Sequence, residues 1–387
     1  MKKRIIGIIF ILFSTFLFGK KSNIVVENRY DNLIHNDIKV DIKYKEDDLP
    51  ELLDYVFIKT LHAAIRKEPN PKAELIYNAP FNTKYRLLEK VKVGETHWYK
   101  VKTSKGIGYV FEKSADVKTF RFEKMVERIK DVEKFIDENN QNNIKLASTN
   151  SYLPNPYNKD MRRTKDKYGI SIDQNIVGVY EKENIELHIP DRSVLSVLEI
   201  KGNKAKVKVE GIPESPLVID KRYLSYNPKI EEGFEKAIVV DIENQNLAAF
   251  EKINGEWTLI SYIYAKTGIE SQLGFETPRG SFIVPLLKYE MGYRDIYGDD
   301  MGIARYAIRF SGGGYLHGTP VDHVEVDNED FFLKQKEDGL GTFKGTRKCI
   351  RNTVSHAKFL FDWILGDERN QNSNYQRPQE NVMFIIF

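Results

Sequence analysis

The chain has 387 residues, enough for two to four domains, and 41% of them are apolar, which excludes a wholly disordered protein. Its formal net charge of +3 gives no reason to expect a nucleic acid as a partner. Its single cysteine, Cys349, excludes an internal disulfide and a structural metal site of the cysteine-rich kind.

Residues 1–19 predict a signal peptide or an N-terminal anchor. The basic residues 2–4 precede the uncharged run 5–18, which is short for a membrane span but typical of the apolar part of an export signal. Gly19 is a candidate cleavage position, but Leu17 fits the expected small residue poorly, so both interpretations stay open. We therefore expect an exported protein of the periplasm or cell envelope, which meets the membrane only through an uncleaved anchor.

Residues 20–54 form a polar N-terminal segment, in which alternation over 38–44 indicates an early strand. Residues 55–116 hold short strand-like runs separated by turn signals, which predicts a small barrel. Three motifs in this range resemble the bacterial SH3-like domain: Arg-x-x-Pro at 66–69, Trp-Tyr-Lys-Val at 98–101 and Gly-x-Gly-Tyr-Val at 106–110.

The middle of the chain changes character twice. Residues 117–147 predict a connecting helix, because apolar residues from Met125 to Ile136 recur at helical spacing. Residues 148–169 carry prolines and a charged cluster and predict a linker. Alternation returns over 170–228 and predicts a second small β domain, for which an SH3-like barrel is one candidate.

Residues 232–387 predict a mostly β domain with one helix. Strand-like runs lie at 237–241, 246–250, 258–264 and 382–387. The helix is predicted after Cys349, where apolar residues from Val354 to Ile364 share one face. The fold class expected for the whole chain is therefore mainly β with some α.

Thiol chemistry is the activity that this last domain suggests. Acyl transfer by a cysteine needs a base and donors for the oxyanion, and the domain holds His317, His323 and His356 beside its one thiol. Cys349 is expected near the start of the predicted helix, whose dipole would favour the thiolate. The basic residues at 347, 348 and 351 would add to that effect or form a solvated patch.

Several separated motifs, in this order, resemble the YkuD-type L,D-transpeptidase domain. They are Ala265-Lys266-Thr267-Gly268, Thr277-Pro278-Arg279-Gly280-Ser281-Phe282, Arg309-Phe310, Gly314-Tyr315-Leu316-His317-Gly318-Thr319 and Thr346-Arg347-Lys348-Cys349-Ile350-Arg351. The resemblance implies a C-terminal YkuD-like β-sandwich catalytic domain, preceded by one or two small SH3-like barrels.

The resemblance also implies site roles. Cys349 matches the nucleophile, and His317 matches the base that takes the thiol proton and later protonates the leaving amine. The backbone N–H groups of Lys348 and Cys349 match the oxyanion donors. The expected oxyanion and substrate-binding positions are Lys348, Gly318, Arg351, Thr346, Gly314 and Tyr315.

The implied reaction is peptidoglycan cross-linking or remodelling. Cys349 would attack a tetrapeptide stem, D-alanine would leave, and an amine acceptor would resolve the thioester. Peptidoglycan stem peptides are the expected partners, and neither a metal nor an organic cofactor is expected. Two alternatives stay open: an L,D-carboxypeptidase that uses the same cysteine and histidine, and a wall-binding protein with a degenerate catalytic domain.

Two departures from the family pattern bear on these roles. The family usually has glycine where this chain has Lys348, and glycine permits a backbone angle that lysine adopts rarely. The interval between His317 and Cys349 is also longer than usual. The extra segment, 321–345, is expected to form an enlarged flap over the cleft, with a plain surface insertion as the alternative.

The same residues allow rival assignments. His323 could replace His317 as the base, although it lies outside the motif. His356 reads as a surface or packing residue, and the glycines at 312–314 as a tight turn beside the cleft. Papain-like wall peptidases place their cysteine before a distant histidine, and the order of residues here argues against that class.

Overall fold

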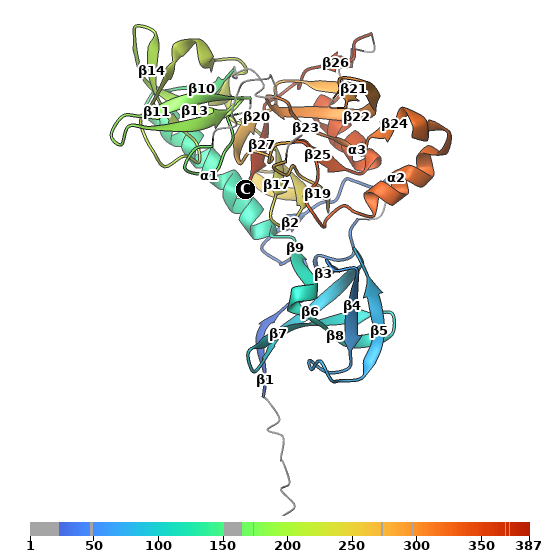
Figure 1. Ribbon diagram of the computed structural model, residues 1–387. Helices are drawn as coiled ribbons and strands as arrows, with labels where there is room; N and C mark the ends of the chain where they lie inside the picture. Colours follow the sequence, from blue (N-terminus) through green and yellow to red (C-terminus); the bar gives the residue numbers. More distant parts are fainter. Residues whose placement is uncertain are drawn as a thin grey trace, which may run out of the picture.

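The computed structural model describes residues 23–46, 49–150, 165–172, 174–271, 274–295, 297–367, 369–370 and 372–387. The expected signal or anchor at 1–19 and most of the expected linker at 148–169 lie outside the described residues. No helix among the described residues is long and apolar enough to cross a membrane. Figure 1 shows a lower β domain, an upper pair of β domains, and the helix α1 running between them.

The lower domain is a small, strongly curved sheet. Its elements are β1 (Ile24–Arg29), β3 (Asp54–Ile58), β4 (His62–Arg66), β5 (Leu75–Pro80), β6 (Lys84–Val93), β7 (Thr96–Thr103), β8 (Gly106–Phe111), η1 (Glu112–Ser114) and β9 (Ala115–Thr119). The strand order is β5-β4-β8-β7-β6-β3-β9, and β1 pairs with β6. Alternate residues such as Val56, Leu87 and Val101 are fully buried in one core, so this part of the chain forms a small β domain of its own.

A long amphipathic helix follows this domain. α1 (Phe122–Gln141) buries Met125, Ile129, Val132 and Ile136 along one stripe, as their spacing predicted. The range expected for the connecting helix, 117–147, is longer than α1, because its last residues enter a strand of the next domain.

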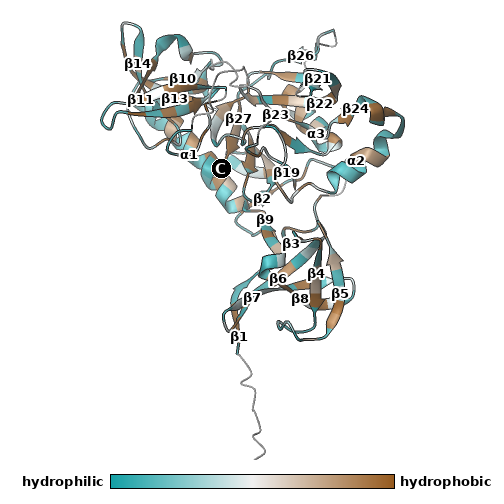
Figure 2. Ribbon diagram, in the orientation of Figure 1, coloured by the Kyte–Doolittle hydropathy of each residue, from teal (hydrophilic) through white to brown (hydrophobic). Residues whose placement is uncertain are grey.

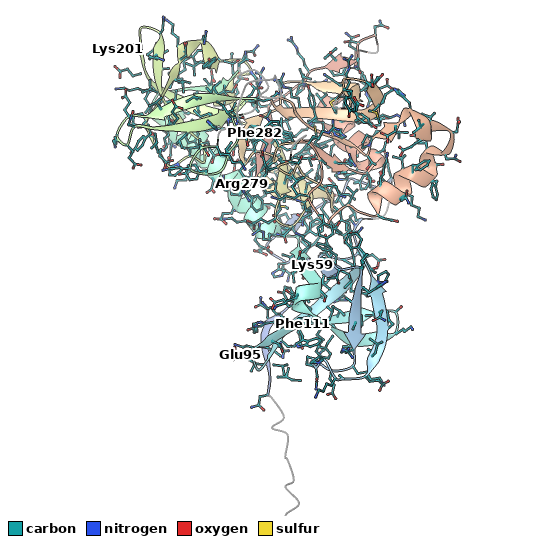
Figure 3. All side chains as sticks on the ribbon, viewed as in Figure 1. Lys59, Glu95, Phe111, Lys201, Arg279 and Phe282 are labelled. Carbon is teal, nitrogen blue, oxygen red and sulfur yellow. The ribbon has the colours of Figure 1, made fainter. Side chains whose placement is uncertain are left out.

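The second β domain closes around its own core. Its elements are β10 (Lys145–Thr149), β11 (Asn175–Tyr180), β12 (Ile185–Pro190), β13 (Val194–Lys201), β14 (Lys204–Val209), β15 (Leu217–Asp220), η2 (Lys221–Tyr223) and β16 (Leu224–Ser225). The order is β12-β11-β15-β14-β13-β10-β16. Figure 3 shows Lys201 at the outer end of this domain, and Phe282 of the C-terminal domain where the two upper domains meet.

The C-terminal domain is a sandwich of two sheets. One has the order β2-β19-β18-β17-β27-β20 and the other β25-β23-β22-β21-β26, with β24 paired to β22. The strands of the first sheet are β2 (Lys39–Val40), β17 (Lys236–Asp241), β18 (Asn246–Ile253), β19 (Glu256–Tyr264), β20 (Gly280–Ile283) and β27 (Val382–Ile386). Those of the second are β21 (Leu287–Arg294), β22 (Asp300–Ser311), β23 (Gly314–Gly318), β24 (Val321–Asp322), β25 (Ile350–Asn352) and β26 (Tyr375–Gln376). The helices are η3 (Ile230–Glu232), η4 (His323–Asn328), α2 (Glu329–Glu337) and α3 (Val354–Leu365).

The first sheet is covered on both faces, which explains the continuous apolar runs in its strands. On β17, Val239 faces the core shared with α1, whereas Ile238 and Val240 face the core shared with the second sheet and α3. Each such fully buried side chain stabilises the fold by roughly 1.5–3 kcal/mol relative to an exposed one. Figure 2 shows apolar strands at the centre of this domain.

The N-terminal segment belongs partly to the C-terminal domain. β2, which lies within the alternating stretch 38–44, pairs in parallel with β19. Tyr44 then hydrogen-bonds Ser355 on α3 at 2.8 Å, and its ring meets that of His356 edge-on. The chain therefore leaves the lower domain after β1, adds an edge strand to the sandwich, and returns to the lower domain at β3.

The insertion at 321–345 joins the sandwich to the SH3-like domain. After α2, Asp338 accepts a hydrogen bond from Lys84 Nζ at 2.9 Å, and Gly341 accepts one from Tyr55 Oη at 2.6 Å. The Phe343 ring stacks on Phe81 with a centroid separation of 5.6 Å. The sequence predicts a flap over the cleft for this segment. In the structure, the end of the segment, residues 338–343, contacts the SH3-like domain.

Candidate active site

One face of the second sheet gathers the chemically important side chains. β23 and β25 run in parallel, with Leu316 opposite Ile350 and His317 opposite Arg351. Leu316 and Ile350 point into the sandwich core. Because side chains alternate along a strand, His317 and Arg351 point to the other face, toward which Cys349 also projects. The pairing thus brings together two motifs that are distant in sequence.

His317 is buried and held in one tautomer. Its Nδ1 lies 2.7 Å from the carbonyl oxygen of Gly318. A carbonyl can only accept, so Nδ1 carries the proton and Nε2 keeps a free lone pair. Burial lowers the pKa of His317 to about 4, with a further lowering by the charge of Arg351 and an opposing effect of the Gly318 carbonyl. At neutral pH the ring is therefore a neutral base with its acceptor atom defined.

Cys349 is partly exposed at the end of the loop that precedes β25. Its Sγ lies 3.8 Å from the carbonyl oxygen of Gly313. Desolvation raises the pKa of the thiol, while the Tyr315 backbone and the charges of Lys348 and Arg351 act in the opposite direction. The net direction is upward, so the resting cysteine is a thiol and must lose its proton during the reaction.

The expectation of a helix-activated cysteine is wrong in one respect. α3 begins at Val354, with Thr353 as its N-cap, and β25 separates this helix from Cys349. A helix dipole acts within its first turn, so it contributes little to this thiol. Arg347 does not contribute either, since its exposed side chain donates to the Arg294 carbonyl at 2.8 Å. The favourable charges are those of Lys348 and Arg351.

Lys348 adopts the backbone conformation that favours glycine. Its φ is +109°, although it is not glycine. Its side chain is 3% exposed. The chain therefore keeps the turn that a glycine would make easily, and the surrounding structure must stabilise both the strained angle and a buried cation.

The strand and loop at 265–280 hold Lys348 in place. Thr277 Oγ1 accepts from the Gly268 N–H at 2.7 Å and donates to the Lys348 carbonyl at 2.8 Å. A side chain at Gly268 would lie 2.7 Å from the Lys348 backbone, so only glycine permits this approach. Thr346 Oγ1 also donates to the Cys349 carbonyl. These contacts fix the backbone on both sides of the nucleophile.

The remaining predicted residues lie around the same point. Gly318 is buried, and a side chain there would lie 2.9 Å from the Val354 backbone. Gly314 opens β23, where a side chain would meet the Phe310 ring at 2.7 Å. The predicted turn at 312–314 joins β22 to β23 and supplies the Gly313 carbonyl that meets Cys349.

Arg351 is anchored by its backbone and surrounded by protein. Its N–H donates to the Lys266 carbonyl at 2.9 Å, and its own carbonyl accepts from the Lys266 N–H at 2.8 Å. Burial lowers the pKa of the guanidinium, while Cys349 and Asp322 act in the opposite direction. Arg351 therefore supplies a positive charge beside the thiol and close to the start of the insertion.

The other histidines of the domain lie in different surroundings. His323 is exposed on η4 and pairs with Asp300 at 3.3 Å. His356 is fully buried on α3. Asn352, with its amide oriented so that its oxygen accepts from His356 Nδ1 at 2.9 Å, donates to the His317 carbonyl at 3.2 Å. His356 thus supports the strand that carries His317.

Potential metal ligands lie close together at another place. His35, Asp37 and Glu123 bring ligand atoms within 4.8 Å of one another, and all three side chains are exposed. Solvated groups of this kind are common at protein surfaces, and none of the three belongs to the strands that carry His317 and Cys349.

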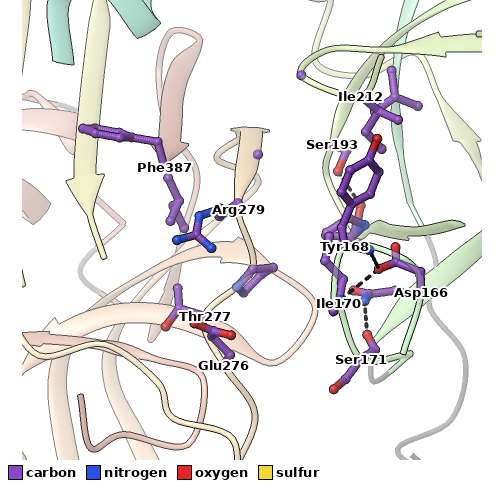
Figure 4. Close-up of a pocket in the computed structure, with 18 of the residues that line it drawn as sticks. Asp166, Tyr168, Ile170, Ser171, Ser193, Ile212, Glu276, Thr277, Arg279 and Phe387 are labelled. Atoms are coloured by element: carbon purple, nitrogen blue, oxygen red, sulfur yellow. Dashed lines mark hydrogen bonds between the residues drawn. The ribbon is translucent and has the colours of Figure 1, made fainter. Parts of the chain in front are cut away.

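A pocket of about 460 Å³ lies between the second β domain and the sandwich. Figure 4 shows Thr277, Arg279 and Phe387 on one side and Tyr168 and Ile212 on the other. Lys348 also lines this pocket. The loop that carries the nucleophile is therefore bordered by the second β domain as well as by its own sheet.

Several supporting residues were not predicted from the sequence. Thr277 lies in a motif that was recognised, but no role was given to it. Gln245 donates to Thr267 Oγ1 at 2.6 Å and accepts from the Thr267 N–H at 2.8 Å. Asp191 reaches the sandwich from the second β domain and pairs with Arg309 at 2.6 Å. No local pattern marks Gln245 or Asp191, because their partners are distant in sequence.

Comparisons with known proteins agree with this arrangement. Residues 235–371 match the YkuD family, described as the L,D-transpeptidase catalytic domain, and residues 61–117 match the bacterial SH3 domain. No curated protein matches the chain.

Similar solved structures share little sequence with this chain. One is a fused Zn-dependent amidase/peptidase/peptidoglycan-binding domain-containing protein from Clostridium acetobutylicum, with 17% identity over 40% of this chain and 52% of that one, and a TM-score of 0.25. An L,D-transpeptidase from Stackebrandtia nassauensis has 17% identity over 40% of this chain and 56% of its own, with a TM-score of 0.26. An L,D-transpeptidase from Mycobacterium smegmatis has 13% identity over 63% of this chain and 99% of its own, with a TM-score of 0.27.

The chain spans about half the length of the first two of these proteins, at 52% and 56%. The assignment to a family rests on the two matched segments, 61–117 and 235–371. The second of them contains Cys349, His317 and the strands that carry them. The chain therefore contains a bacterial SH3 domain and an L,D-transpeptidase catalytic domain of the YkuD family.

Proposed function

We propose that this protein is a peptidoglycan L,D-transpeptidase that uses Cys349 as its nucleophile and His317 as its general base. One observation carries the proposal. The only thiol of the chain lies immediately before β25, on the sheet face that also carries a neutral histidine with a defined tautomer. A thiol and a base held by neighbouring strands are what cysteine acyl transfer requires.

The first half-reaction forms a thioester. Sγ of Cys349 attacks the carbonyl carbon of the third stem residue while its proton passes to Nε2 of His317. The backbone N–H groups of Lys348 and Cys349 are the proposed donors to the oxyanion. The tetrahedral intermediate then collapses, the bond to D-alanine breaks, and the leaving amine takes the proton from His317.

The second half-reaction restores the thiol. An amine from another stem attacks the thioester, loses a proton to His317, and expels the sulfur, which is reprotonated. Water in place of the amine would give a shortened stem and free thiol, which is the L,D-carboxypeptidase outcome. Both outcomes use the same two side chains, so the acceptor decides between them.

The resting protonation states support a coupled proton transfer. The pKa of His317 is lowered and that of Cys349 is raised, so both groups are neutral near pH 7. The thiolate then forms as the carbonyl is attacked, with Lys348 and Arg351 stabilising the developing negative charge. The strained φ of Lys348 is retained where the family has glycine, which supports an intact loop over a degenerate one.

We propose that the protein acts in the cell envelope after export, as residues 1–19 suggest. The SH3 domain and the second β domain would then orient the catalytic domain on the wall. The SH3 domain contacts the sandwich through Tyr55, Lys84 and Phe81, so it is not an independent tether.

Product analysis tests this proposal. Purified protein is incubated with tetrapeptide muropeptides, with and without an amine acceptor, and the products are identified by mass spectrometry. We expect loss of D-alanine and a cross-linked product, and neither with Cys349→Ala. Release of D-alanine without cross-links in the presence of acceptor would favour the carboxypeptidase. An inactive wild type that still binds isolated cell walls would favour the wall-binding alternative.

A further inference from the structure

We propose that Asn352 is a positioning residue for the base His317, and that the buried His356 orients Asn352 for this task. Asn352 holds the backbone on both sides of Gly318, whose carbonyl in turn holds the imidazole of His317. The kinetic part of the inference rests on the proposed function, because it takes His317 to be the base. Its structural part depends only on the hydrogen bonds around Gly318.

The carbonyl that fixes the tautomer of His317 belongs to a glycine. His317 Nδ1 lies 2.7 Å from the carbonyl oxygen of Gly318. Glycine has no Cβ to restrict its backbone, so the direction of this carbonyl depends on contacts from elsewhere in the structure. If the peptide unit turned away, the ring would lose the acceptor that keeps its proton on Nδ1. Nε2 could then carry the proton, and in that form it cannot take one from a thiol.

Asn352 supplies such contacts from the neighbouring strand. Gly318 on β23 lies opposite Asn352 on β25 in the parallel pair. The Asn352 carboxamide donates to the His317 carbonyl at 3.2 Å. The main-chain carbonyl of Asn352 accepts from the Thr319 N–H at 2.9 Å and from Thr319 Oγ1 at 3.0 Å. One fully buried residue therefore bonds the residues on both sides of Gly318.

His356 determines which way the Asn352 carboxamide faces. The backbone carbonyls of His317 and Thr353 lie 3.2 Å from one end of the carboxamide, and carbonyls only accept, so its nitrogen is at that end. Its oxygen then faces His356 Nδ1 at 2.9 Å, and this nitrogen must carry a proton to donate. A buried amide oxygen is costly to leave unsatisfied, so loss of the donor would favour other orientations of the carboxamide.

His356 is itself fixed by its surroundings. Its side chain is fully buried, and its backbone N–H donates to Thr353 Oγ1 at 3.3 Å. The ring of Tyr44 meets the imidazole edge-on with centroids 4.9 Å apart, and the ring of Phe359 lies 5.9 Å away. Tyr44 belongs to the N-terminal segment, outside the matched segment 235–371. The support of the base therefore extends beyond the matched catalytic domain.

Paired substitutions at positions 352 and 356 test the inference. Asn352→Leu keeps the approximate size of the side chain and removes its amide. His356→Leu removes the donor to Asn352, whereas His356→Asn keeps an N–H close to the position of Nδ1. The control is Asn139→Leu, which removes a buried amide that donates to the Phe135 carbonyl at 2.7 Å on α1.

Two readouts separate positioning from a general loss of stability. The first is the tautomer of His317 near neutral pH, from the nitrogen-15 chemical shifts of histidine-labelled protein, with His317→Gln to assign the signal. This readout requires no catalysis by the enzyme. The second is the kcat and KM of acyl transfer.

We expect the wild type to carry the His317 proton on Nδ1 alone. In Asn352→Leu the Nε2-protonated form should appear, and kcat should fall by about tenfold or more with KM nearly unchanged, because positioning acts on the transition state. His356→Leu should give the same kinds of change, and His356→Asn should recover most of them. His356→Leu should have a much smaller effect in the Asn352→Leu background, because His356 acts through Asn352. Asn139→Leu should match the wild type in both readouts.

An unchanged His317 tautomer in Asn352→Leu would overturn the inference, whatever the kcat of that variant. Equal losses in His356→Leu and His356→Asn would overturn the role of His356. If the variants do not fold, the wild type decides, because a His356 ring protonated only on Nε2 could not donate to Asn352 and would overturn the inference. A changed tautomer in Asn352→Leu, with a wild type that transfers no acyl group, would reject the proposed function and keep the structural part.

Discussion

The buried His317 makes the stability of the protein depend on pH in a predictable way. Its pKa is about 4 in the folded protein and 6.5 when the ring is exposed. Below pH 6.5 the unfolded chain gains a proton that the folded chain rejects, so stability is lost as the pH falls from 6.5 toward 4. Relative to neutral pH, the proton linkage of His317 lowers the free energy of unfolding by about 2 kcal/mol at pH 5 and by about 3 kcal/mol at pH 4.

His317→Gln isolates this contribution, because glutamine does not titrate. Carboxylates also destabilise the protein in acid, but they do so in both proteins. The free energy of unfolding in urea, measured at several pH values, should therefore fall by about 2 kcal/mol more in the wild type than in His317→Gln between pH 7 and pH 5. NMR titration of [13C]-histidine-labelled protein gives the pKa directly, and the variant assigns the signal.

Parallel pH dependence of the two proteins would refute this reasoning. A His317 signal that titrates near pH 6.5 would do the same, because the ring would then be hydrated and not buried as a neutral base. The same result would remove the argument for a neutral cysteine and histidine pair at rest. In the catalytic assay we expect the acid limb of kcat/KM to lie well below pH 6.5.

Two further substitutions test the support of the site. Thr277→Val should lower the free energy of unfolding by roughly 1–3 kcal/mol, because it leaves the Gly268 N–H and the Lys348 carbonyl without their partner. The rate of acyl transfer should fall about tenfold or more. Thermal unfolding measures the first effect and kcat the second. Full activity of this variant would contradict the role given to Thr277. Gly341→Ala should destabilise the protein by roughly 1–3 kcal/mol, because the φ of Gly341 is +75° and the new side chain would lie 2.5 Å from Tyr55 Oη. The control is Gly94→Ala, at a glycine that also has a positive φ but open space around it. Equal melting temperatures of the two variants would contradict the interdomain contact.

The strands and the long helix were predictable because their signals are local. The apolar stripe of α1 and the continuous apolar runs of β17 and β27 follow directly from burial on one face or on two. The end of the helix was less predictable. The expected range reached residue 147, but residues 145–147 begin β10, whose pairing with β13 depends on residues far along the chain.

In the candidate site, too, the residues with local sequence motifs were predictable, whereas those defined by distant contacts were not. Cys349 and His317 could be named from their motifs, and the turn at 312–314 from its glycines. The wrong expectation of a helix dipole came from placing α3 too close to Cys349, because three residues form β25 before the helix begins. Asp191 could not have been named, since its role comes from contact between two domains.

The most direct test of the central claim is the mass of the intact protein during turnover. Wild-type protein mixed with a tetrapeptide donor and no amine acceptor should gain the mass of the donor without D-alanine, and fragmentation should place it on Cys349. Cys349→Ala should gain nothing, while its stability should change by less than about 1 kcal/mol because the side chain is partly exposed. An adduct on another residue, or turnover by Cys349→Ala, would contradict the claim that Cys349 carries the acyl group.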